Sequence, residues 1–98
     1  MQSFVVGVGR ISILLGGTRS LKEKRSVVRR VIARVREKFN VSVAEVGALD
    51  VWNHALLGFA VVSNDGPFVD RVLSQVITFV GELRLAEIGE VSTEVLHV

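Results

Sequence analysis

The chain has 98 residues, with one proline, nine glycines and no cysteine, and 49% of its residues are hydrophobic. This length suits a single domain over residues 1–98, and the absence of cysteine excludes disulfides, thiol catalysis and zinc sites built on thiolates. No apolar run reaches the ~18 residues of a transmembrane helix and the start lacks a signal-peptide pattern, so we expect a cytoplasmic protein that does not associate with membranes.

The first third of the chain predicts a strand and a helix. Residues 4–15 are rich in valine and isoleucine and end at a Gly-Gly pair, which is typical of a long strand followed by a turn. Ser20 and Glu23 then form the capping-box pattern of a helix start. The helix predicted over residues 21–39 has an apolar stripe at helical spacing, which consists of Leu21, Val28, Val31, Ile32, Val35 and Phe39.

Two further strands follow in the middle of the chain. Residues 41–46 alternate as a short strand, with Glu45 on the same side as Val41 and Val43. A loop over residues 47–53 then leads to a third strand over residues 55–63.

The last third predicts a helix and a strand. Asp65 can cap a helix that begins at Pro67 and runs to residue 83. The final strand, residues 86–96, alternates between apolar and polar side chains. The predicted order is therefore βαββαβ.

With right-handed crossovers, this order predicts an α+β fold of the ferredoxin-like type, in which an antiparallel four-stranded sheet carries two helices on one face. The other face stays uncovered. We expect Arg10 to pair there with the acidic residues of the last strand, Glu90 and Glu94. If the third strand adds apolar residues to that face, two sheets can pack together in a homodimer, which also agrees with the high hydrophobic content.

The charge of the chain is concentrated on the first helix. The net charge is only +2, yet residues 19–38 hold nine of the twelve basic residues and only two acidic ones, a local balance of +7, whereas the remainder has a balance of −5. On a helical wheel, four of these cations fall within a sector of roughly 60° beside the apolar stripe, with no acid among them. These four residues, Lys22, Arg25, Arg29 and Arg36, are called the basic ridge below.

Several cations also lie where the helix dipole is positive and each costs roughly 0.3 to 1 kcal/mol. A bound phosphate would reverse that cost, because free N–H groups at a helix start bind anions. The candidate nucleic-acid or anion-binding residues are therefore Arg19, Lys22, Lys24, Arg25, Arg29 and Arg36.

Other interpretations of the same helix remain open. The cations can simply keep an exposed helix solvated, or the ridge can meet an acidic surface of another subunit or protein in a homo-oligomeric scaffold. The turn over residues 16–20 could also belong to a phosphoryl enzyme, an interpretation that rests on fold analogy alone.

The loop before the third strand contains Asp50, Trp52 and His54. A catalytic site would need a nucleophile or a metal that the sequence does not supply nearby, so we expect no catalytic residue and no metal site. Since tryptophan is enriched at interfaces, Trp52 and His54 are candidate interface residues.

Four segments of the chain resemble the YlxP-like family of small bacterial proteins, a family of unknown function. They are RSLKEKR (residues 19–25), FNVSVAEVG (39–47), the D-x-W of residues 50–52, and ALLGFAVVSND (55–65). The resemblance implies a ferredoxin-like fold. Because genes of this family often lie beside genes for transcription elongation, translation initiation and ribosome binding, it also implies a role with RNA or the ribosome. The chain departs from the family pattern at Ala48, where an acidic residue is expected, and at Asn53-His54.

We therefore expect a non-enzymatic, cytoplasmic protein without a cofactor that binds RNA or the ribosome through its basic first helix. The alternative is a homo-oligomeric scaffold or protein-interaction module that uses the same helix. Steep salt dependence would distinguish the first function, since phosphate contacts release counterions.

Overall fold

The computed structural model describes residues 3–98, and these residues form the predicted order of elements. Each element begins and ends within one residue of the position expected from the sequence. The elements are β1 (Val5–Leu14), α1 (Leu21–Lys38), β2 (Ser42–Gly47), β3 (His54–Ser63), α2 (Gly66–Glu82) and β4 (Glu87–His97).

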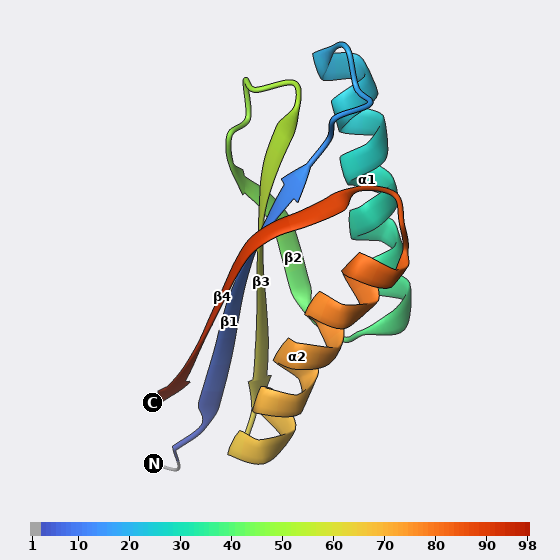
Figure 1. Ribbon diagram of the computed structural model, residues 1–98. Coiled ribbons are helices and arrows are strands. Elements are labelled where there is room, and N and C mark those ends of the chain that lie inside the picture. Colours follow the sequence, from blue (N-terminus) through green and yellow to red (C-terminus); the bar gives the residue numbers. More distant parts are fainter. Residues whose placement is uncertain (1–2) are drawn as a thin grey trace.

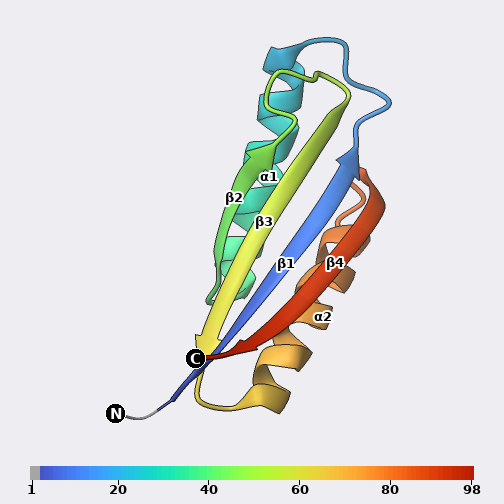
Figure 2. The ribbon, with the colours of Figure 1, turned by 90° about the vertical axis from the view of Figure 1, so that its left-hand side faces the viewer.

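The four strands form one antiparallel sheet in the order β2-β3-β1-β4. Both helices lie on the same face of this sheet (Figure 1). Turned by 90°, the molecule presents its other face, which neither helix covers (Figure 2). The predicted α+β, ferredoxin-like fold with two helices on one face is confirmed.

The core lies between the sheet and the two helices. Alternate residues of β1 and β3 point toward the helices, and Phe59, one of them, is 4% exposed. α1 packs against β2, whereas α2 packs against β1, β3 and β4. The helices bury the apolar stripes expected from their spacing, with Val28, Val31 and Val35 from α1 and Val69, Val72, Leu73, Val76 and Val80 from α2.

Gly7 allows α2 to approach the centre of the sheet closely. A Cβ atom at this position would lie 2.4 Å from Cγ1 of Val69 and 3.0 Å from Cδ1 of Leu73. Any larger residue would therefore push the helix away from β1.

The uncovered face carries both apolar and charged side chains. Arg10 of β1 lies directly opposite Ser92 of β4. Glu94 lies two residues further along β4, opposite Val8. No carboxylate within residues 3–98 forms an ion pair with Arg10. The expected pairing of Arg10 with Glu90 or Glu94 is therefore wrong for the single chain, because the register places a serine across from the arginine.

Candidate nucleic-acid interface

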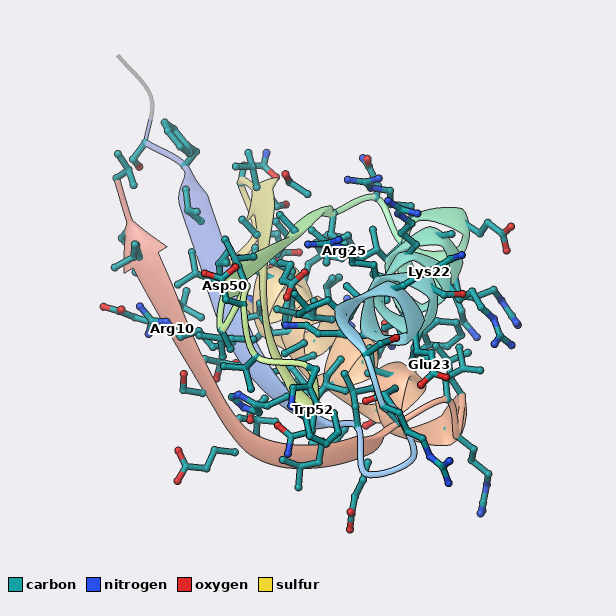
Figure 3. All side chains as sticks on the ribbon, turned by 90° about the horizontal axis from the view of Figure 1, so that it is seen from above. Arg10, Lys22, Glu23, Arg25, Asp50 and Trp52 are labelled. Atoms are coloured by element: carbon teal, nitrogen blue, oxygen red, sulfur yellow. The ribbon has the colours of Figure 1, made fainter. Side chains whose placement is uncertain are left out.

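The basic ridge lies on one exposed flank of α1. Lys22, Arg25, Arg29 and Arg36 are all exposed, as is Arg19 just before the helix. In Figure 3, Lys22 and Arg25 lie at α1, with Arg25 on the side of the helix toward the strands, while Arg10 lies at the far side of the sheet. From Lys22 to Arg36 the ridge extends about 21 Å along the helix axis, at ~1.5 Å per residue.

No acidic side chain within residues 3–98 forms an ion pair with the ridge. Within residues 3–98 the ion pairs are Lys24 with Glu45 and Arg34 with Glu37, and neither includes a ridge residue. Arg34 and Glu37 lie on the other side of α1, where their charged atoms are 3.7 Å apart. The net positive charge of the helix is thus concentrated on one flank.

Arg36 fixes the position of the ridge relative to the sheet. Its Nη2 donates a hydrogen bond to the carbonyl oxygen of Val43 in β2, at 3.1 Å. Since β2 is an edge strand, this bond occupies a carbonyl group that another chain could otherwise use for pairing. The ridge therefore runs along the flank of α1 that faces the β2 edge, and Arg36 keeps further guanidinium donors free for a ligand.

Lys24 does not belong to this surface. Its side chain is 0% exposed, and its ammonium donates hydrogen bonds to the carbonyl oxygens of Ala48 at 2.5 Å and Val51 at 2.6 Å. Oε2 of Glu45 lies 2.9 Å from the same nitrogen, although the angle of that contact is not one of a hydrogen bond, so the attraction is between charges. The prediction that Lys24 contacts phosphate is wrong, because the fold encloses its charge.

The sequence contained the signal for this burial. Lys24 lies four residues before Val28 and seven before Val31, which places it on the apolar stripe of α1. Glu45 alternates with Val41 and Val43 on the inward side of β2. A base and an acid that both face the core need each other as partners, because unpaired buried charge is costly.

The start of α1 is already capped from within the chain. Oγ of Ser20 accepts a hydrogen bond from the backbone N–H of Glu23 at 3.1 Å, and the Glu23 carboxylate accepts one from the N–H of Arg19 at 2.5 Å. The predicted cap by Ser20 is confirmed, whereas the Glu23 carboxylate binds the N–H of Arg19, one residue before the N-cap, and not that of Ser20. The expected phosphate site on the remaining N–H groups of this turn stays a prediction.

The loop between β2 and β3 is held against the start of α1. Lys24 binds two of its carbonyl oxygens, and the buried hydroxyl of Thr18 donates to the carbonyl oxygen of Trp52 at 2.7 Å. Ala48 has a positive φ of 58°, which turns the chain at the beginning of the loop. The Trp52 side chain is nevertheless 47% exposed (Figure 3), so the backbone of the loop is fixed while its aromatic ring faces outward.

His54 lies on the uncovered face of the sheet, where its Nε2 is 2.6 Å from Oγ of Ser12. This contact is not predictable from the sequence, because it depends on the register of β1 against β3. Among residues 3–98, no acidic side chain hydrogen-bonds the other ring nitrogen, as one does in a Ser-His-Asp triad. The structure thus brings Ser12 to His54 and leaves Asp50, a loop neighbour in sequence, exposed and apart from them.

The part of the chain that the structure describes offers neither a cluster of metal-ligating side chains nor a helix that could cross a membrane. No three His, Asp or Glu side chains within residues 3–98 come close enough to hold a metal ion. Neither α1 nor α2 is long and apolar enough to span a bilayer.

Comparison with protein families gives one match over most of the chain. Residues 6–93 match the family described as "Protein of unknown function (DUF503)". The chain is also 36% identical over 76 residues to "Uncharacterized protein YlxP" of Bacillus subtilis (strain 168). The aligned region covers 78% of this chain and 83% of that protein. The resemblance to YlxP-like proteins is confirmed, and neither description assigns an activity.

Solved structures resemble the chain in fold alone. The de novo designed protein Foldit4 matches 95% of this chain and 97% of its own, with a TM-score of 0.50 and 18% sequence identity. SnoaB, a cofactor-independent oxygenase from Streptomyces nogalater, matches 99% of this chain and 92% of its own, with a TM-score of 0.44 and 18% identity. Neither match carries a function over to this chain.

Proposed function

We propose that this chain, which belongs to the DUF503 family of proteins of unknown function, is a cytoplasmic protein that binds structured RNA, including ribosomal RNA, through α1. The observation that carries this proposal is the basic ridge. Its cations are exposed, lie on one flank of a single helix, and form no ion pair within residues 3–98. Such a row suits a phosphate backbone, which presents regularly spaced negative charge.

The proposed contacts are to phosphate and not to base edges. Arginine and lysine on one face of a helix neutralise phosphates without reading sequence, so affinity depends on salt and only weakly on which bases are present. Arg19 and the four ridge residues could make five such contacts. The expected slope of log Kd against log salt is then about 4.5, at roughly 0.9 per phosphate for a duplex.

The buried Lys24 supports this function indirectly. Because its charge is neutralised by Glu45 inside the protein, the ridge does not depend on it, and the start of α1 is held rigidly against the β2–β3 loop. A fixed helix loses little conformational entropy when phosphates bind to it.

The test is co-sedimentation with ribosomal subunits and with bulk structured RNA, at low and at near-physiological salt. The double variant Arg25→Glu, Arg29→Glu should lose binding at both salt concentrations, because it places two acids in the middle of the ridge. The matched control is Arg30→Glu, Arg34→Glu, which makes the same charge change on the same helix but away from the ridge. This control should retain most of the binding, and far-UV circular dichroism should show both variants folded.

Two outcomes would contradict the proposal. If the wild type does not bind at low salt, the ridge is not a surface for RNA and an acidic protein surface becomes its best ligand. If both double variants lose binding equally, only net charge matters and the ridge is not the site.

A further inference from the structure

The uncovered face of the sheet is too apolar for a surface that stays in water. Three of its large hydrophobic side chains are strongly exposed, with Val62 at 65%, Val46 at 55% and Leu96 at 41%. Between them, Val6, Val8, Leu56 and Ala60 are half-buried. A continuous apolar surface across four strands is characteristic of an interface and not of an ordinary monomer surface.

The size of this face matches that of a stable protein–protein interface. The strands contain 10, 6, 10 and 11 residues, which at ~3.3 Å per residue and ~4.8 Å between strands gives a flat area of about 600 Å². Side-chain relief increases that area toward the ~800 Å² that each partner buries in a standard interface. A shallow hollow of about 810 Å³ lies in the middle of the face and is lined in part by Val8, Arg10, Ala60 and Glu94.

The charges on this face fit a second copy of the same face. Arg10 points away from the helices on the open side of the sheet (Figure 3) and forms no ion pair within residues 3–98. Glu94 lies on the adjacent strand, also without an ion pair in that part of the chain. A face that presents one unpaired base and one unpaired acid near its centre is complementary to itself, because a two-fold axis brings each charge to the opposite one.

From these observations we infer that two copies of the chain pack sheet against sheet through the uncovered face, with Arg10 of each subunit paired to Glu94 of the partner subunit. The register supports such a two-fold axis. Val8 pairs with Glu94 along the sheet, and Arg10 lies two residues after Val8. The axis lies in the interface and runs across the strands at the level of the pair of Gly9 and Phe59. It sets Arg10 of one subunit over the partner's Val8, beside the partner's Glu94.

The same axis matches apolar residues on β3. Leu56 and Val62 lie three residues before and after Phe59, so each faces the other across the interface. Packed sheets are rotated by about 30° relative to each other, which moves residues far from the axis out of register. The rotation displaces residues near the axis only slightly. The contacts of Arg10, Glu94 and the centre of β3 therefore tolerate it, because these parts lie near the axis.

The interface is separate from the basic ridge. α1 lies on the opposite side of the sheet (Figure 1), so a dimer through the uncovered face leaves both ridges exposed. The ridge of one subunit does not contact the other subunit, which distinguishes this dimer from an oligomer built on the basic helix.

The test is the oligomeric state of purified protein by analytical ultracentrifugation from about 1 to 100 μM, at near-physiological salt. The wild type should sediment as a dimer. Arg10→Glu and Glu94→Arg should each raise the dimer dissociation constant at least tenfold, because each places like charges across the interface. The double variant Arg10→Glu, Glu94→Arg should restore dimerisation to within about threefold of the wild type, since the opposite charges meet again.

A second variant tests the apolar part of the same face. Val62→Glu buries a charge among the apolar residues and should yield a monomer, whereas Arg30→Glu on the outer surface of α1 should leave the dimer intact. A wild type that is monomeric at every concentration would overturn the proposal and assign the face to a different protein. If the Val62→Glu variant remains a dimer, the proposed interface is wrong. If the charge-swapped double variant does not restore dimerisation, the proposed two-fold axis is wrong.

Discussion

The ammonium of Lys24 joins three segments of the chain, because α1 carries it, β2 supplies Glu45, and the loop after β2 supplies the carbonyl oxygens of Ala48 and Val51. Those carbonyl groups lie at the turn that begins with a positive φ at Ala48, where the carbonyl oxygen of Ala48 also accepts the backbone N–H of Val51 at 3.0 Å. The lysine adds its donors to this turn, and the loop keeps its shape partly through a side chain of the neighbouring helix.

Replacing Lys24 with methionine should lower the free energy of unfolding by about 3 kcal/mol, since the change leaves the Glu45 charge without its partner and removes the donor to the carbonyl oxygens of Ala48 and Val51. In a domain of this size the melting temperature should fall by roughly 15 °C. Trp52 is the one tryptophan of the chain and lies in the affected loop, so its fluorescence and far-UV circular dichroism measured during urea unfolding report the loop and the whole fold separately.

Lys22→Met is the matched control, because it removes the same group two residues earlier at an exposed position. Its effect should stay within about 0.5 kcal/mol. Equal stabilities for the two variants would show that Lys24 contributes no more than a surface lysine.

Some of these side-chain contacts could be predicted from the sequence and others could not. The cap of α1 by Ser20 was predictable, because Ser20 and Glu23 lie within one helical turn. The burial of Lys24 was predictable in principle from its spacing to Val28, although its charge is the same as that of the seven other cations of α1, which are exposed. The contact of Ser12 with His54 could not be predicted, since it depends on a strand register that joins residues 42 positions apart.

At the scale of elements, the approach of α2 to β1 depends on the missing side chain of Gly7. A Cβ atom there would overlap Val69, so Gly7→Ala should destabilise the fold by about 1–3 kcal/mol through overpacking. The double variant Gly7→Ala, Val69→Ala should recover part of this loss, because it removes the overlapping methyl groups. Thermal unfolding of the wild type and the two variants measures both effects.

Gly16→Ala provides the control for that experiment. An added Cβ atom at Gly16 meets nothing within 4 Å, and its φ is not positive. Alanine there should be neutral or stabilising by about 0.4–1 kcal/mol, because it restricts the unfolded chain. If Gly7→Ala were equally harmless, α2 would have to pack more loosely on the sheet than the structure shows.

Element boundaries were predictable from the sequence because each change of period coincides with a local signal, such as the Gly-Gly pair after β1 or Asp65 before α2. Whether Arg10 forms an ion pair across the sheet was not predictable in the same way. The alternation of β4 places Glu94 on the uncovered face, but only the register against β1 shows that Ser92 and not an acid lies opposite Arg10. Periodicity determines the face of a strand, whereas register also depends on turns and on the irregularity between Ile11 and Ile13.

On the scale of the whole molecule, the proposed dimer would carry two basic ridges on its two outer surfaces, because each sheet faces the other and each α1 faces outward (Figure 1). A long RNA can then contact both ridges at once, while a short hairpin can occupy only one. Binding at the second ridge is intramolecular after the first contact has formed, which raises the overall affinity without any new kind of contact.

The monomeric variant Val62→Glu should therefore bind a short RNA hairpin with the same Kd per chain as the wild type, since its ridge is intact. Its affinity for ribosomal subunits or long structured RNA should fall by about 100-fold, because the second ridge is lost. Fluorescence anisotropy with a labelled hairpin and sedimentation with subunits measure the two values. A parallel loss on the hairpin would mean that the substitution damages the ridge itself, whereas unchanged affinity for long RNA in a variant that is monomeric would show that one ridge accounts for all of the binding.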